Sequence, residues 1–180
     1  MNEFLSYEYT IKQKCEGLLL AKRICLVAIY VLCVLILLGL AIITRIFAPF
    51  LALVPLSMWI LVYFTWRYVD VEYEISAISG VLTVSKIYGG KSRKKILETS
   101  IKNMIAILPY DEKNYQKALR FSPDTEYRAI SSESAETVYF ALFETTDEKN
   151  KKAIFFFEPD GENGKILKIM KFYNAAAMTQ

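Results

Sequence analysis

Apolar residues fill the stretch from Ile24 to Trp66 almost without interruption, and Arg45 is its one charged side chain. A single helix of that length would extend about 65 Å, roughly twice the hydrocarbon thickness of a bilayer. An arginine at the bilayer centre costs about 2.5–3.5 kcal/mol on insertion scales, so Arg45 is expected at a membrane surface. The pattern therefore predicts a transmembrane helical hairpin over residues 24–68, with Arg45 in its turn.

Residues 1–23 form a separate, amphipathic segment in front of the hairpin. Apolar side chains recur there every three or four positions, with charged residues beside them, at Phe4, Tyr7, Ile11, Cys15 and Leu18. That spacing is typical of a helix with one apolar face. It fits two interpretations equally: a juxtamembrane helix lying on the membrane surface, or a helical extension of the first crossing.

A different periodicity begins directly after the hairpin. Residues 69–76 alternate apolar and polar side chains, as in a half-buried strand. Further short runs of strand-forming residues follow at 81–88, 93–99, 101–108, 127–131, 137–144 and 153–157. Residues 147–152 are expected to form a charged hairpin turn. Helical spacing appears only in a short segment that Asp111 could cap and, from Gly164 on, at Ile166, Ile169, Met170 and Tyr173.

These elements predict an α+β membrane protein, in which residues 69–180 form one domain. About seven antiparallel strands would make a β-barrel or sandwich, and the C-terminal helix would cap its open end. This is the architecture of pleckstrin-homology-like (PH-like) domains. The whole chain resembles a family of uncharacterised small membrane proteins of low-GC Gram-positive bacteria, in which a two-helix hairpin precedes such a domain. The resemblance rests on residues 71–75, 80–87, 93–95, 109–111 and 157–159. The family has an acidic residue where Ser85 stands, and the resemblance implies no activity and no binding residues.

The basic residues predict the orientation of the hairpin. Lys12, Lys14, Lys22 and Arg23 precede it and Arg67 follows it, whereas Arg45 stands alone at the turn. Because Lys and Arg are retained on the cytoplasmic side, both termini are expected in the cytoplasm of a cell-membrane protein with two spans. Residues 1–69 carry six basic and three acidic side chains, and the remaining 111 residues carry 16 of each. The domain is thus electrically neutral, which argues against nucleic-acid binding.

The composition also limits the chemistry of the protein. Histidine is absent, and the three cysteines, Cys15, Cys25 and Cys33, all lie at or before the first helix of the hairpin. Histidine-based acid–base catalysis, Ser-His and Cys-His nucleophiles and histidine-ligated zinc are therefore excluded. No nucleophile-elbow, phosphate-loop or metal-ligand spacing occurs, so we expect no catalytic residue, no metal and no cofactor, and interpret the protein as a non-enzyme.

One local concentration of charge stands out in the neutral domain. Five basic residues bracket the Gly89-Gly90 turn: Lys86, Lys91, Arg93, Lys94 and Lys95. They resemble, in placement, the basic residues around an early strand–strand loop with which some PH domains bind phosphorylated lipids, and anionic phospholipid headgroups would be the corresponding ligand. The alternative is a hairpin that its charges keep soluble and protected from edge pairing.

Two other segments invite a functional interpretation. Residues 109–126 form the longest irregular stretch and place Tyr110, Tyr115 and Phe121 among charges, which suits either a binding loop or a tolerated insertion. Glu72 and Glu74 recur at strand spacing and could be mistaken for a carboxylate pair. We expect them on the solvated face of the first strand after the hairpin.

The sequence thus favours a membrane-tethered, non-catalytic binding or scaffold module. Its partners would be the bilayer itself, anionic lipid headgroups and an unidentified protein recruited to the cytoplasmic surface. The alternative is an accessory subunit that packs its hairpin against a larger membrane complex. Gly39 and Ala41 provide only a small patch for such helix packing.

Overall fold

The computed structural model of the protein describes residues 6–145, 151–160 and 164–178. The chain forms two compact units. The hairpin unit comprises Lys14–Val71 and Tyr88–Ser92, and the sheet unit comprises Met1–Gln13, Glu72–Ile87 and Arg93–Gln180. The chain therefore leaves the sheet unit after its first strand and returns to it after the hairpin.

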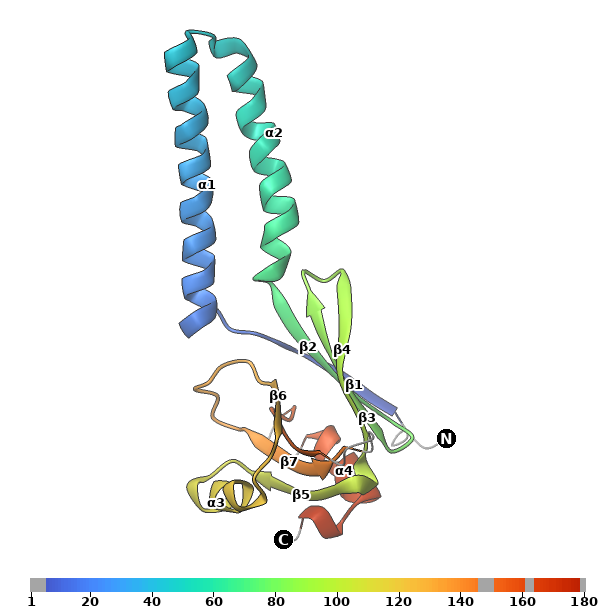
Figure 1. Ribbon diagram of the computed structural model, residues 1–180. Coiled ribbons are helices and arrows are strands. Elements are labelled where there is room, and N and C mark those ends of the chain that lie inside the picture. The colour runs from blue at the N-terminus through green and yellow to red at the C-terminus, as the bar shows by residue number, and fades with distance from the viewer. Residues whose placement is uncertain (1–5, 146–150, 161–163, 179–180) are drawn as a thin grey trace. The chain divides into compact units, whose positions relative to one another are not determined.

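The hairpin unit contains two long apolar helices, as predicted (Figure 1). Helix α1 spans Gly17–Thr44 and α2 spans Phe47–Thr65, followed by a 3-10 turn at Trp66–Tyr68. Arg45 ends α1 in the left-handed conformation, with φ of 55°, so the predicted turn residue is confirmed. Both helices are long and apolar enough to cross a membrane. A hydrogen bond between the hydroxyls of Tyr30 and Thr65 joins them.

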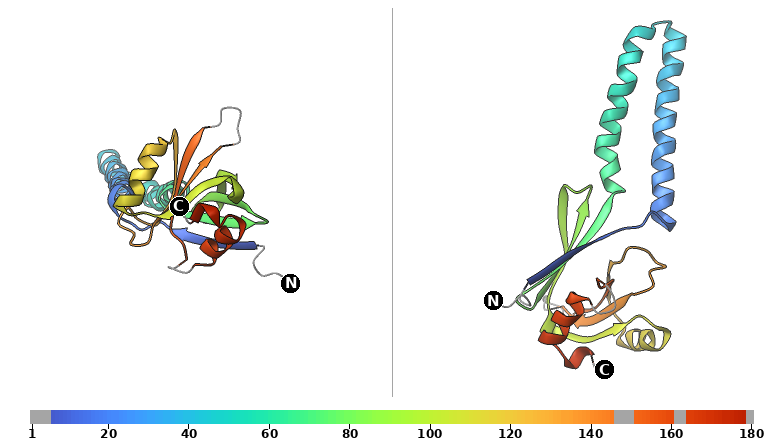
Figure 2. Two further views of the ribbon diagram at one scale, coloured as in Figure 1. Left: turned by 90° about the horizontal axis from the view of Figure 1, so that it is seen from below. Right: turned by 180° about the vertical axis from the view of Figure 1, so that it is seen from behind.

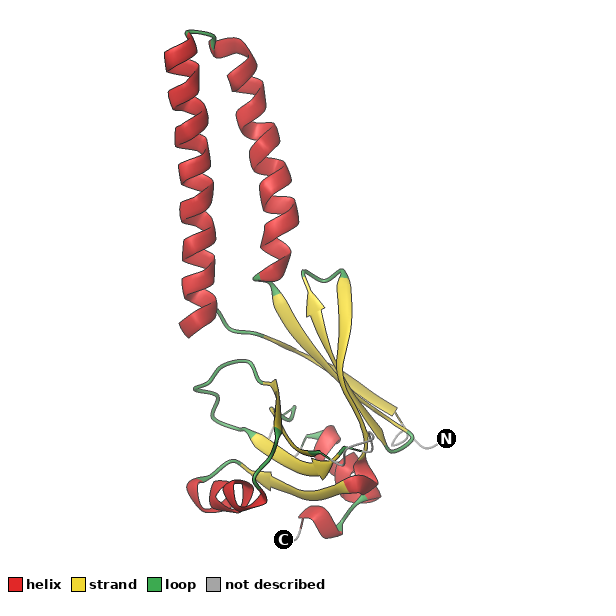
Figure 3. Ribbon diagram, in the orientation of Figure 1, coloured by secondary structure: helices red, strands yellow, loops and turns green. Residues whose placement is uncertain are grey.

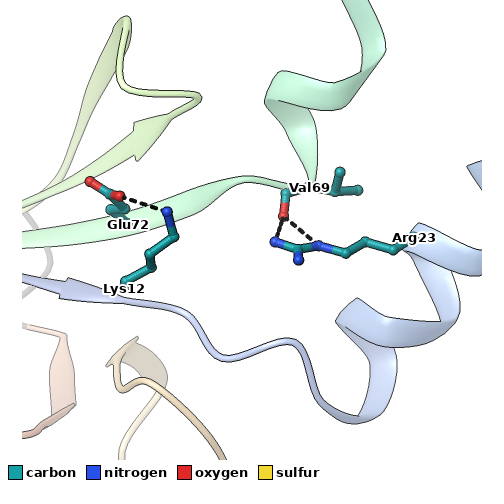
Figure 4. A network of polar contacts seen from close by, with 4 residues as sticks. All are labelled: Lys12, Arg23, Val69 and Glu72. Atoms are coloured by element: carbon teal, nitrogen blue, oxygen red, sulfur yellow. Dashed lines mark hydrogen bonds and ion pairs between the residues drawn. The ribbon is translucent and has the colours of Figure 1, made fainter. Parts of the chain in front are cut away.

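A second polar contact joins the beginning of α1 to the residues that follow α2. Arg23 Nη2 donates a hydrogen bond to the Val69 carbonyl at 3.0 Å (Figure 4). The Arg23 guanidinium also lies 5.9 Å from the centroid of the Trp66 ring. Because arginine must keep its charge solvated, this contact suits the interfacial end of a membrane hairpin, where a long side chain can reach out of the apolar layer.

The first sheet has the order β1-β2-β3-β4. Its strands are β1 (Ser6–Lys12), β2 (Val71–Ile78), β3 (Val81–Tyr88) and β4 (Ser92–Ser100). The expected helix in residues 1–23 is therefore wrong for residues 6–12. These residues pair antiparallel with β2, from Ser6 opposite Ile78 to Lys12 opposite Glu72. Figure 2 shows β1 beside β2 at the edge of this sheet.

Alternate side chains, on one face of β1, hold this strand in the sheet unit. Ile11 is buried, and the Tyr9 hydroxyl donates to the Glu158 carbonyl at 2.7 Å. The Tyr7 hydroxyl donates to the Asp160 carboxylate, and this hydrogen bond raises the pKa of Tyr7 to about 12. Lys12, on the opposite face, lies 3.4 Å from Glu72 (Figure 4). Residues 6–12 thus belong to the same fold as residues 72–180.

The second sheet has the order β5-β7-β8-β6. Its strands are β5 (Met104–Pro109), β6 (Thr125–Ala129), β7 (Tyr139–Glu144) and β8 (Lys152–Phe157). The expected fully antiparallel arrangement is wrong at one pair, because β6 runs parallel to β8. The two sheets form a sandwich and are not closed into a barrel. Strand β7 is central and buried on both faces, as predicted; the turn expected at 147–152 falls largely outside the described residues.

Two helices complete the sheet unit and lie at opposite ends of β5 (Figure 3). Helix α3 spans Glu112–Phe121, and Asp111 caps it by accepting from the Asn114 N–H at 2.6 Å, as the sequence indicated. Helix α4 spans Lys165–Tyr173 and buries the predicted apolar face, with its lysines exposed. After α4, the Asn174 side chain donates to the carbonyls of Ile101 and Met104. These hydrogen bonds hold residue 174 near the start of β5.

Candidate functional site

The basic residues of the candidate site follow one hairpin of the first sheet. Lys86 lies on β3, Lys91 lies in the turn, and Arg93, Lys94 and Lys95 lie on β4. Successive side chains of a strand point to opposite faces, so Arg93 and Lys95 share one face of β4 and Lys94 points to the other. The predicted group is therefore divided between two faces and the turn.

Three of these residues interact with other side chains of the sheet unit. Arg93 Nη2 lies 2.6 Å from Glu74 Oε2, and Lys95 forms an ion pair with Glu98. The Lys86 ammonium lies 5.7 Å from the centroid of the Tyr73 ring. These contacts explain why so many positive charges are tolerated on neighbouring strands, and part of the cluster thereby has a structural role.

Glu74 corrects the expectation that both acidic residues of β2 are solvated. Its side chain is only 6% exposed, whereas Glu72 is half-buried. Burial raises the pKa of Glu74, a hydrogen bond with Glu8 of β1 raises it further, and the charge of Arg93 opposes the shift. Arg93 is thus the cation that favours the ionised form of Glu74, and removing it would raise the pKa of this carboxyl group further.

The β3–β4 turn, within Tyr88–Ser92, belongs to the hairpin unit and packs against the end of α2 (Figure 1). The Gly89 N–H donates to the Asp70 carbonyl at 2.7 Å, and the Tyr68 and Tyr88 rings lie 6.4 Å apart. Gly89 has a positive φ of 56°, and a Cβ at this position would lie 2.8 Å from the Arg67 Cβ. Glycine is therefore required here for both conformation and space.

Lys91 extends from this turn to the aromatic residues at the end of α2. Its ammonium lies 4.6 Å from the centroid of the Tyr63 ring, and Trp59 stacks on the same ring. Tyrosine and tryptophan gather at the headgroup level of membranes, because their rings are amphipathic. Lys91 is therefore brought to the residues that would mark the membrane interface.

Sequence inspection missed one residue of this arrangement. Arg67 lies between α2 and the turn; its guanidinium lies 5.0 Å from the Tyr68 ring centroid, and its buried Nε has no hydrogen-bond partner within the described ranges. The sequence did contain a signal for this residue, because Arg67 directly follows the apolar stretch and its aromatic residues. Its approach to Gly89, 22 residues later, depends on the strand pairing and could not be anticipated.

The arrangement offers cationic and aromatic side chains but no recognisable catalytic geometry. Among the described residues, no group of three His, Cys, Asp or Glu side chains could hold a metal ion. Positive charges beside an aromatic belt suit the binding of anionic headgroups.

Comparison with known proteins agrees with the architecture. No curated protein and no solved structure gives a match to this chain. One family, described as "Bacterial PH-like domain (DUF6106)", matches residues 3–179, which includes β1, both long helices and both sheets. Because the match spans nearly the whole sequence, the chain belongs to this family of bacterial PH-like domains.

Proposed function

We propose that this protein is a membrane-tethered, non-catalytic binding module, whose β3–β4 turn contacts anionic lipid headgroups. The carrying observation is the packing of the turn against the end of α2, through the Gly89–Asp70 hydrogen bond and the Lys91–Tyr63 contact. A turn held there presents its charges to the surface that the helices enter. A basic residue close to an anionic bilayer gains about 1 kcal/mol.

The proposal includes a topology with both termini in the cytoplasm. The pairing of β1 with β2 supports it, because residues 6–12 and 71–78 can form one sheet only on the same side of a membrane. The excess of Lys and Arg before α1 and after α2 supports the cytoplasmic side.

Labelling of Cys15 tests the orientation. Cys15 is exposed and precedes α1, whereas Cys25 and Cys33 lie within that helix. A membrane-impermeant maleimide should modify Cys15 only after cells are permeabilised, and a Cys15→Ser variant provides the background signal. Labelling of intact cells would reverse the proposed topology.

The contacts of the basic residues favour unequal contributions to the proposed lipid contact. Arg93 and Lys95 are paired with Glu74 and Glu98, so their charges are partly neutralised. Lys91 lies in the turn, and Lys94 is exposed on the opposite face of β4. We therefore assign the larger contribution to Lys91 and Lys94.

A soluble form of the sheet unit allows this assignment to be tested. Lys12 and Glu72 are register partners, so an Asn-Gly pair joining them would replace the hairpin by a two-residue turn and retain β1. Circular dichroism and a cooperative melting transition establish that this form is folded. It should bind vesicles that contain phosphatidylglycerol and should not bind pure phosphatidylcholine vesicles, and its binding should fall steeply with salt.

In this form, changing Lys91 and Lys94 to Ser should weaken vesicle binding about 30-fold, since two lysines contribute about 2 kcal/mol. The matched control changes Lys168 and Lys171, exposed on α4, to Ser and removes the same net charge. Vesicle co-sedimentation measures both variants. Equal weakening in the two variants would leave the cluster with a structural role alone.

A further inference from the structure

The sheet unit contains a second candidate site. A cavity of about 290 Å³ lies beside α3 and is lined in part by Tyr110 and Tyr115 of residues 109–126. Ligand pockets generally measure about 300–1,000 Å³, so this one suits a small molecule. Its walls combine three aromatic rings, two opposite charges and small apolar side chains: Tyr110, Tyr115 and Phe156, with Arg128 and Glu133.

Local structure fixes the aromatic residues. The Tyr110 N–H donates to the Val138 carbonyl at 2.8 Å, and Asp111 then caps α3, whose first turn carries Tyr115. The Tyr110 ring centroid lies 5.3 Å from that of Tyr115 and 5.8 Å from that of Phe156, at interplanar angles of 70° and 82°. Rings set nearly edge to face form an aromatic corner, and a π face of this corner that is open to the cavity would attract an ammonium group.

The parallel pairing of β6 with β8 adds the positive charge. Arg128 is the register partner of Phe156, and its guanidinium carbon lies 5.6 Å from the centroid of that ring. Arg128 Nε donates to Glu126, which raises the pKa of Arg128, and the charge of Glu133 adds to this effect. Nε takes the Glu126 bond, and among the described residues the two Nη groups make no further hydrogen bond. This edge of the guanidinium therefore offers a pair of donors that matches a carboxylate.

Glu133 supplies the opposite charge from the β6–β7 connection. The ion pair with Glu126 partly neutralises the charge of Arg128. A simple anion in the cavity would be repelled by Glu133, and a simple cation would still meet the guanidinium of Arg128. A ligand that carries both charges satisfies both residues and places its ammonium against the rings.

We propose that this cavity binds a small zwitterion, a free amino acid or an N-methylated amino acid. Glu133 and the aromatic corner receive the ammonium group, and Arg128 receives the carboxylate. This site is separate from the proposed headgroup contact, and its ligand would make the membrane module a sensor or carrier of a small metabolite.

Ligand pairs that differ by one charge test the proposal on the full-length protein in detergent micelles. Glycine betaine and L-isoleucine are the zwitterionic probes, titrated by saturation-transfer NMR. In 3,3-dimethylbutanoate a carbon replaces the betaine nitrogen, and choline lacks the carboxylate. We expect at least one zwitterion to bind at least tenfold more tightly than both single-charge analogues. Equal binding of either analogue, or no binding of both zwitterions, overturns the proposal.

Matched variants locate the site. Glu133→Gln and Arg128→Gln should each raise the dissociation constant of the bound zwitterion at least tenfold. Glu112→Gln and Arg120→Gln, which remove the same charges from exposed positions of α3 outside the cavity, should leave it within twofold. Unchanged affinity in the cavity variants contradicts the assignment. The comparison of ligands on the unaltered protein decides the question even where a variant loses its fold.

Discussion

Ile169→Asp should destabilise the sheet unit by at least ~3 kcal/mol, because it places a carboxylate on the buried face of α4. Ile169 is 2% exposed and lies among the other buried residues of this helix. No described cation of α4 faces inward, since Lys165, Lys168 and Lys171 are all exposed. The measurement is the urea midpoint and melting temperature of the full-length protein in mild detergent.

Lys168→Asp is the matched control for this variant. It introduces the same residue one position earlier in α4, on the exposed face. Its cost should stay below ~1 kcal/mol, because only helix propensity and surface charge change. Similar destabilisation by both variants would show that α4 does not pack through the face described.

The double variant Tyr9→Asn, Ile11→Asn should remove β1 from the first sheet and destabilise the sheet unit by ~4 kcal/mol. Ile11 is a buried side chain, whose truncation in a core costs about 2–5 kcal/mol. Tyr9 also loses the hydrogen bond to the Glu158 carbonyl. Limited proteolysis should then cleave near residues 6–12, which pairing with β2 is expected to protect in the unaltered protein.

Thr10→Asn provides the comparison for the double variant, since Thr10 is exposed between the half-buried Tyr9 and the buried Ile11. Protection and stability should stay close to those of the unaltered protein. If proteolysis of the double variant were also unchanged, the pairing of β1 with β2 would not contribute to stability.

The sequence predicts the elements whose pattern is strong within one segment. The hairpin and its turn at Arg45 follow from composition, and α3 follows from the cap at Asp111. The buried face of α4 follows from helical spacing. In each case the physical cause, apolar length or periodicity, is contained in neighbouring residues.

Strand β1 shows how two periodicities compete. Tyr7 and Ile11 fit helical spacing, but Tyr7, Tyr9 and Ile11 also alternate with polar residues, as in a strand. The hydroxyls of both tyrosines bind acceptors in residues 158–160, far away in sequence. The choice between helix and strand is therefore made by tertiary contacts that no local window contains.

For a similar reason, local sequence patterns could not predict the burial of Glu74 or the direction of β6. Glu74 is buried because Glu8 and Arg93 flank it from other strands. Five residues of β6 carry no information about strand direction, which depends on the crossover through α3 and on the partner β8. The five candidate basic residues remain a prediction as a binding site, and the ion pairs of Arg93 and Lys95 could not be foreseen from the sequence.

Because the hairpin lies between β1 and β2 in the sequence, the two paired strands are synthesised at different times. Strand β1 leaves the ribosome first, and 58 residues separate Lys12 from Val71, where β2 begins. At about 5–20 residues per second, β1 waits about 3–12 s before its partner exists. Both apolar helices are made in that interval. If the two helices cross a membrane, the first sheet can be completed only after α1 and α2 have been inserted with their ends on one side, and an arrest of insertion would leave β1 unpaired and open to degradation.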